Sequence, residues 1–177
     1  MGFPFRLRAV WACVLAALFC LDAFCGGPDL KPVSRAAVVR SVIDGDTVQI
    51  QNGERVRLIG INAPEYEPWR NLEEPYGREA ALFLKRLLTG KKIFLESDSE
   101  KKDKYGRTLS YAYFEDGRFI NRLLVSEGYA RARYYRPNGR YYQLLKEAEG
   151  EAKAGKKGLW AAGGPSKSGL EKFRARV

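Results

Sequence analysis

Residues 37–61 read AVVRSVIDGDTVQIQNGERVRLIGI and contain three predicted strands in succession. Residues 37–43 are rich in β-branched side chains, and residues 47–51 alternate apolar and polar side chains with the period of two that strands have. Asn52-Gly53 predicts a hairpin turn, because both residues tolerate positive φ. A third strand is expected at residues 54–61.

The rest of the sequence predicts two more strands and three helices. The expected segments follow in this order: a surface loop at 66–75, a helix at 76–88, strands at 92–96 and 108–114, and helices at 119–127 and 141–154. The first helix gathers Ala80, Leu84 and Leu88 on one apolar face. Together the elements predict an α+β fold that is mainly β-barrel, a five-stranded OB-fold barrel with three helices. Such a barrel leaves one outer face and its loops free for a ligand.

The composition favours a single basic domain that binds a polyanion. The chain has 177 residues, of which 45% are hydrophobic, so it can bury one core but not two full ones. Its net charge of +10 favours nucleic acid as the partner, ahead of an anionic membrane surface. It has no histidine, which excludes His-based ribonucleases, Ser-His-Asp hydrolases and zinc sites with His ligands. Any catalysis must use carboxylates, hydroxyls, Lys, Arg or a hard metal ion.

Residues 1–25 have the pattern of a secretory signal peptide. Two arginines precede an apolar run at 9–21, which is shorter than the roughly 20 residues that a transmembrane helix needs. A secreted or periplasmic protein is expected. The alternative is a membrane anchor, through an uncleaved leader or through a lipid on Cys20 or Cys25. The rest of the chain is expected to divide into a lead-in linker at 26–36, a barrel domain at 37–160 and a flexible basic tail at 161–177.

Four short segments concentrate acids, arginines and tyrosines in predicted turns and loops. They are 43–47, Arg57 with 62–65, 103–107 and 131–138. Taken singly, each has a plain structural interpretation. Asp-Gly is common in hairpin turns. A strand arginine, a basic turn and a tyrosine-containing loop can each simply face the solvent. All four segments in this order would occur by chance far less often than any one of them alone.

The order and spacing of these segments resemble the staphylococcal nuclease family across residues 37–160. The matching motifs are VIDGDT (42–47), RLIGINAPE (57–65), YGREA (76–80), DKYGR (103–107) and GLW (158–160). The resemblance implies a secreted nuclease that uses Ca²⁺ to hydrolyse DNA and RNA with little sequence preference, leaving 3′-phosphates. A preference for single strands and a monomer with no obligate protein partner are also expected.

The resemblance implies catalytic roles for three residues. Glu65 matches the general base that accepts a proton from the attacking water. Arg57 and Arg107 match two arginines that clamp the phosphate, and each planar guanidinium group can bind two oxygens while staying charged. Phosphodiester hydrolysis needs such cations, because negative charge grows on the phosphate as water attacks.

The implied Ca²⁺ ligands are Asp46, the side chain of Asn62 and the backbone carbonyl of Ala63, with Asp44 acting through a metal-bound water. The family usually has Asp where this chain has Asn62. An amide oxygen can still ligate Ca²⁺, but the site loses one negative charge. Weaker Ca²⁺ binding is therefore expected.

The implied substrate groove contains Lys104, Tyr105 and either Tyr134 or Tyr135. Lysine would contact phosphate, and tyrosine rings would stack on bases whatever the base identity. The tyrosine loop is one residue shorter than in the best-known member of the family. That difference leaves the choice between Tyr134 and Tyr135 open.

Two other functions fit part of the sequence. A non-catalytic nucleic-acid-binding OB-fold domain would explain the charge and the aromatic residues. It would not explain why Arg57, Glu65 and Arg107 occur together, because binding alone needs no general base. A basic protein that docks on an anionic membrane would explain the charge but not the carboxylates.

Overall fold

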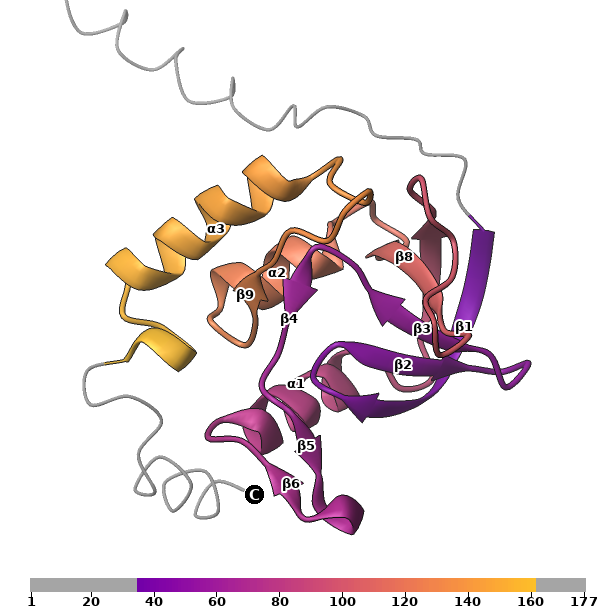
Figure 1. Cartoon of the computed structure of the whole chain (residues 1–177), viewed down its shortest axis with the longest axis horizontal. Coiled ribbons are helices and arrows are strands. Elements are labelled where there is room, and N and C mark those ends of the chain that lie inside the picture. The colour runs from indigo at the N-terminus through magenta and orange to yellow at the C-terminus, as the bar shows by residue number, and fades with distance from the viewer. Residues whose placement is uncertain (1–34, 162–177) are drawn as a thin grey trace, which may run out of the picture. The chain divides into compact units, whose positions relative to one another are not determined.

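The computed structural model describes residues 35–161. Its elements follow in chain order: β1 (Arg35–Asp44), β2 (Thr47–Ile50), β3 (Arg55–Leu58), β4 (Ile61–Asn62), β5 (Tyr66–Glu67), the 3₁₀ helix η1 (Pro68–Arg70), β6 (Leu72–Glu73), α1 (Gly77–Leu88), β7 (Lys92–Glu96), β8 (Thr108–Tyr113), α2 (Ile120–Ser126), β9 (Arg131–Ala132), α3 (Tyr142–Ala154) and the 3₁₀ helix η2 (Gly158–Trp160). Strands β1-β2-β3-β8-β7 close into a barrel in that order (Figure 1). The predicted five-stranded barrel with three α-helices is confirmed.

The barrel is held by one parallel and four antiparallel pairings. Strand β3 runs parallel to β8, and the other neighbours are antiparallel. The Asn52-Gly53 turn joins β2 to β3 as predicted, with Gly53 at φ 86°. Because β3 lies between β2 and β8, strand pairing on both sides fixes the backbone that carries its central side chains.

One main core fills the barrel and extends to the helices. Helix α1 packs along β1, whereas α2 packs against β8 and α3. The apolar face predicted for the first helix lies in this core, with Ala80, Leu84 and Leu88 all fully buried. At ~25 cal/mol per Å² of buried apolar surface, this core supplies most of the favourable free energy of folding.

A buried asparagine on α2 joins the helix to two segments of the barrel. Asn121 is completely buried. Its Oδ1 accepts a hydrogen bond from the N–H of Ala112 at 3.0 Å, and its Nδ2 donates to the carbonyl of Ile59 at 2.8 Å. The Ala112 N–H and the Ile59 carbonyl are thereby both hydrogen-bonded, although these two residues do not pair with each other.

The third predicted strand is shorter than expected and continues outside the barrel. Gly60 has φ +79°, and a Cβ at this position would lie 2.6 Å from Leu145 Cδ1. The chain therefore turns away from the barrel after Leu58. It resumes as β4, which pairs with β9 instead of continuing in the barrel. This turn directs the 62–65 segment along the barrel edge.

Residues 66–75, expected as a surface loop, contain a small hairpin. Strands β5 and β6 pair antiparallel around η1, and Figure 1 shows this hairpin standing apart from the barrel strands, next to α1. Proline at the start of η1 and Asn71 in the left-handed region (φ 55°) make the tight reversal possible. Strands β5 and β6 have only two residues each, so an alternation of apolar and polar side chains cannot be recognised in the sequence.

The ends of the chain lie mostly outside the described residues. These are the expected signal peptide at 1–25, nearly all of the linker at 26–36 and the tail at 161–177. Strand β1 begins at Arg35, two residues before the predicted start of the barrel domain. Within residues 35–161, no helix combines the length and the apolar character needed to cross a membrane.

Candidate active site

A cleft of about 370 Å³ opens at the edge of the barrel where several segments meet. They are the β1–β2 turn, β3, the end of β4 with the residues after it, the loop before β8 and the loop after β9. Of the residues singled out in the sequence, the cleft is lined by Asp44, Asp46, Arg57, Asn62, Glu65, Lys104, Tyr105, Arg107 and Tyr135. Segments more than 70 residues apart in the chain thus meet in one site.

The β1–β2 turn holds two buried aspartates at the floor of this cleft. The N–H of Asp46 donates to Asp44 Oδ1 at 2.9 Å, which closes the turn on itself. Asp46 Oδ1 accepts from the Thr47 hydroxyl, and its Oδ2 accepts from the N–H of Ala63 at 2.9 Å. Burial raises the pKa of Asp46, against the opposing effect of Arg57. A buried carboxylate of this kind is stabilised by additional positive charge.

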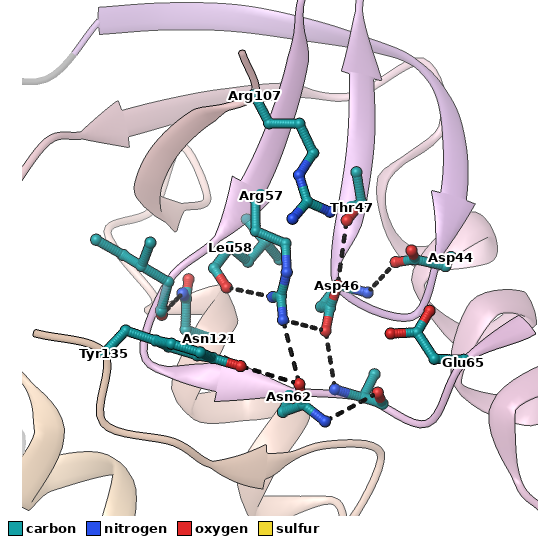
Figure 2. A network of polar contacts seen from close by, with 12 residues as sticks. Asp44, Asp46, Thr47, Arg57, Leu58, Asn62, Glu65, Arg107, Asn121 and Tyr135 are labelled. Atoms are coloured by element: carbon teal, nitrogen blue, oxygen red, sulfur yellow. Dashed lines mark hydrogen bonds and ion pairs between the residues drawn. The ribbon is translucent and has the colours of Figure 1, made fainter. Parts of the chain in front are cut away.

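Arg57 is held in one orientation by three acceptors (Figure 2). One guanidinium nitrogen donates to the carbonyl of Leu58 at 2.8 Å. The other lies 2.9 Å from Asp46 Oδ2 and 3.4 Å from Asn62 Oδ1. With 12% of its side chain exposed, Arg57 is fixed before any ligand binds.

Glu65 is positioned by the start of helix α1 and by the hairpin. Its N–H donates to Glu74 Oε2 at 3.1 Å, and its carbonyl accepts from the N–H of Glu74 at 2.9 Å. Gly77 abuts this backbone so closely that a Cβ there would lie 2.2 Å from the Glu65 carbonyl oxygen. Desolvation raises the pKa of Glu65, and the charge of Asp44 adds to the effect. A raised pKa brings a carboxylate nearer to the neutral range in which general bases work best.

The loop before β8 carries the second arginine and an exposed aromatic ring. Asp103 accepts from Arg107 Nε at 2.7 Å, which leaves the terminal guanidinium nitrogens directed toward the cleft, near Arg57 and Asp46 in Figure 2. Tyr105 is 72% exposed, with Lys104 Nζ and the Arg107 guanidinium 5.0 and 5.4 Å from its ring centre. This side of the cleft therefore presents two cations and a flat apolar surface.

The two candidate tyrosines lie in different surroundings. The Tyr135 hydroxyl donates to Asn62 Oδ1 at 3.0 Å, and Tyr135 lines the cleft. The Tyr134 ring instead packs against Tyr142, with ring centres 5.3 Å apart, and is not among the residues that line the cleft. The tyrosine that geometry favours for substrate contact is Tyr135.

Oxygen donors suitable for a hard cation converge at the cleft floor. One carboxylate oxygen each from Asp44, Glu65 and Glu67 lie within 4.8 Å of one another. Asp46 and Asn62 line the same cleft, and the carboxylate of Asp46 and the amide oxygen of Asn62 both contact Arg57. A donor set made only of oxygens, together with a buried carboxylate that burial destabilises, fits Ca²⁺ or another hard divalent ion.

Glu67 and Arg136 are two charged residues at or beside the cleft to which the sequence assigned no role. Glu67 lies two residues after Glu65, and the fold brings Asp44 of the β1–β2 turn close to both carboxylates. Arg136 lines the cleft beside Tyr135. Its signal was present, since it is a basic residue in the aromatic run at 131–138.

The chain is similar to known nucleases over most of its length. The family model described as "Staphylococcal nuclease homologue" matches residues 55–162. The thermonuclease of Staphylococcus intermedius is 44% identical over 126 residues, covering 70% of this chain and 74% of that protein. The thermonuclease of Staphylococcus hyicus is 42% identical over 123 residues, covering 68% and 72%. Endonuclease YncB of Bacillus subtilis (strain 168) is 39% identical over 127 residues, covering 69% of this chain and 60% of that protein.

Proposed function

Because the chain belongs to the staphylococcal nuclease family and is a phosphodiester hydrolase, we propose that it is a secreted, Ca²⁺-dependent nuclease of broad substrate range. It cleaves DNA and RNA, preferably single-stranded, with little sequence preference, and leaves 3′-phosphates. The observation that carries the proposal is the cleft in which Glu65, Arg57 and Arg107 lie together. A binding domain has no need of a desolvated carboxylate beside two arginines.

In the proposed reaction the two arginines bind the scissile phosphate. Arg57 is already fixed by Asp46 and the Leu58 carbonyl, so it loses little conformational freedom when a phosphate arrives. Arg107 is tied to Asp103 only through Nε, so its terminal nitrogens remain able to bind two phosphate oxygens. Donors held in advance stabilise the charge that develops in the transition state.

Glu65 acts as the general base. It removes a proton from a water molecule as the water oxygen attacks phosphorus, and the bond from phosphorus to the 5′-oxygen breaks. The 3′-side keeps the phosphate, and the departing oxygen gains a proton to become a 5′-hydroxyl. The raised pKa of Glu65 makes its carboxylate a better proton acceptor than an exposed glutamate.

Asp46, Asn62 and the carbonyl of Ala63 are the proposed metal ligands, and Asp44, whose side chain accepts from the N–H of Asp46, would act through a metal-bound water. When bound, Ca²⁺ would offset negative charge on the phosphate and help to hold it in place. In the groove, Lys104 and Arg136 contact flanking phosphates, and the rings of Tyr105 and Tyr135 contact bases or sugars. These contacts are independent of base identity, which supports weak sequence preference.

Secretion and the absence of an obligate partner are part of the proposal and rest on the sequence. The segment 1–25 has the charge and hydropathy pattern of a signal peptide. N-terminal sequencing of the exported protein tests cleavage after about residue 25. An intact N-terminus recovered in the membrane fraction would support anchoring instead.

The proposed activity is tested with purified protein and defined substrates. Single-stranded DNA and RNA are each incubated with Ca²⁺, and the product ends are identified. We expect both to be degraded to 3′-phosphate products, faster than duplex DNA, and EDTA to stop the reaction. Binding without cleavage at any Ca²⁺ concentration would favour the non-catalytic alternative.

A further inference from the structure

The large exposed apolar side chains in the described part of the chain lie on three loops, two of which contribute residues to the cleft. Within residues 35–161, the large hydrophobic residues with the greatest exposure are Trp69, Leu72, Tyr105, Tyr134 and Tyr135. They lie on the β5–β6 hairpin, the loop before β8 and the loop after β9. Such clustering around one site marks a binding surface better than single exposed residues do.

Trp69 is the largest of these side chains and lies at the tip of the hairpin. It is 67% exposed. The neighbouring Glu67 carboxylate belongs to the group that includes Asp44 and Glu65. Since two residues span at most about 7 Å, the Cα of Trp69 lies within about 7 Å of that of Glu67. Trp69 therefore lies on the chain segment that borders this carboxylate group, although it does not line the cleft itself.

The hairpin presents the indole in a fixed frame. Pro68 precedes it in η1, and the N–H of Asn71 donates to the Pro68 carbonyl at 3.2 Å, which closes the turn. At the hairpin base, two hydrogen bonds join Glu74 to the backbone of Glu65. The backbone that carries the indole therefore loses little conformational entropy when the ring binds a ligand.

The charges on the hairpin determine which part of a nucleic acid its tip can bind. The hairpin is acidic, which disfavours contact with phosphates. Glu67 is paired with Arg70 at 2.9 Å and its side chain is only 18% exposed, whereas that of Arg70 is 67% exposed. The tip thus exposes an aromatic ring and a cation, whereas the Glu67 carboxylate is largely covered. A nucleobase, which is flat and uncharged, fits such a tip.

We propose that Trp69 is a base-stacking residue that binds a nucleotide flanking the scissile phosphate and extends the substrate site beyond the cleft. The inference rests on the proposed nuclease function. It adds to that function a subsite for a nucleobase, supplied by the hairpin. An indole ring stacks on any base, so the subsite strengthens binding without adding sequence preference.

The test measures binding with the full chain carrying Glu65→Gln, which removes the proposed base so that the strand stays intact. The probes are fluorescein-labelled oligo(dT) and an abasic strand of the same length, each titrated in Ca²⁺ and followed by anisotropy. Trp69→Ala is expected to weaken oligo(dT) binding by roughly 5- to 100-fold and to leave abasic-strand binding unchanged. Trp69→Phe should recover part of the loss.

Gln143→Ala is the control, because it removes an exposed side chain that lies on α3 and outside the cleft. It should leave both affinities near those of the parent. Unchanged oligo(dT) affinity in Trp69→Ala would overturn the stacking role while leaving the nuclease proposal intact. Equal losses for both strands would also overturn it, because the residue would then support the backbone site. If the Glu65→Gln parent bound neither strand, the proposed function itself would fail.

Discussion

At the scale of single residues, Asn62 connects the two halves of the cleft. Its Oδ1 accepts from Arg57 at 3.4 Å and from the Tyr135 hydroxyl at 3.0 Å. Its Nδ2 faces the Ala63 carbonyl at 3.4 Å. The two donors establish which side-chain atom is the oxygen, and this oxygen faces Arg57, which is proposed to bind the phosphate.

Replacing Asn62 by aspartate should tighten Ca²⁺ binding. The substitution adds one negative charge, and a charge pair 4 Å apart contributes about 1 kcal/mol in water and about 4 kcal/mol near a protein surface. Calorimetric titration should therefore give at least a roughly fivefold lower dissociation constant for Asn62→Asp. Gln143→Glu, which adds the same charge on the exposed side of α3, should bind Ca²⁺ as the parent does. Equal affinity in Asn62→Asp and the parent would remove this residue from the proposed ligands.

Asn121 contributes to stability rather than to chemistry. Asn121→Ala leaves the buried N–H of Ala112 and the carbonyl of Ile59 without their partner, and each such group costs about 1–3 kcal/mol. Urea unfolding should show a loss of roughly 2–5 kcal/mol. The exposed substitution Gln143→Ala should change the free energy of unfolding by less than about 0.5 kcal/mol. A loss below 1 kcal/mol for Asn121→Ala would mean that water replaces the amide.

The sequence identified the residues whose motif is contiguous and missed those whose position depends on a distant segment. Asp46, Arg57 and Glu65 stand in short motifs and line the cleft. Glu67 belongs to the carboxylate group because the fold brings Asp44, from the β1–β2 turn, close to it. Tyr134 and Tyr135 are adjacent and chemically identical, so the packing of Tyr134 on Tyr142, which distinguishes them, was not accessible from local sequence.

At the scale of elements, the barrel is joined at its edge by a glutamate between β2 and β3. Glu54 accepts two hydrogen bonds from Arg35 on β1, both at 2.9 Å, and one from the Thr108 hydroxyl on β8. The pairing with Arg35 holds the pKa of Glu54 at about 2, below its ordinary value of 4.5. One side chain thus ties three strands together while it is ionised.

This pairing predicts a pH dependence of stability. Because the pKa of Glu54 is lower in the folded chain, its contribution is present above pH 4.5 and is lost as pH falls toward about 2. Arg35 is half exposed, so solvent screening limits the contribution to about 1 kcal/mol. Glu54→Gln should be less stable than the parent at pH 6, and the difference should shrink at pH 2. A difference of the same size at both pH values would show that the carboxylate charge is not involved.

Strands and helices were predictable where the apolar pattern is long, and less so where a backbone conformation interrupts it. The barrel strands and the three α-helices begin and end within a few residues of their predicted bounds. The strand expected at 54–61 is divided because Gly60 adopts positive φ. The position of a glycine within an apolar run does not indicate its φ angle. The close approach of Leu145 to Gly60, which leaves no room for a Cβ, is visible only in the folded structure.

At the scale of the whole molecule, the charge of +10 should make nucleic-acid binding strongly dependent on salt. Arg57, Lys104, Arg107 and Arg136 line the cleft as phosphate ligands in the proposal. For about four phosphate contacts on a single strand, the logarithm of the association constant should fall with the logarithm of salt concentration with a slope near −3. Arg136→Gln should reduce the slope by about 1, whereas Arg118→Gln, outside the cleft, should not. A slope near zero would contradict a phosphate-binding cleft.

The central claim is that Glu65 is the proton acceptor in a cleft that binds and hydrolyses phosphodiesters. The most direct measurement is the single-turnover rate of cleavage of single-stranded DNA by the parent and by Glu65→Gln, with DNA affinity measured for both. The account predicts that affinity is retained and that the rate falls by about 10²-fold or more, because only the acceptor is lost. Cleavage at the parental rate by Glu65→Gln would contradict it.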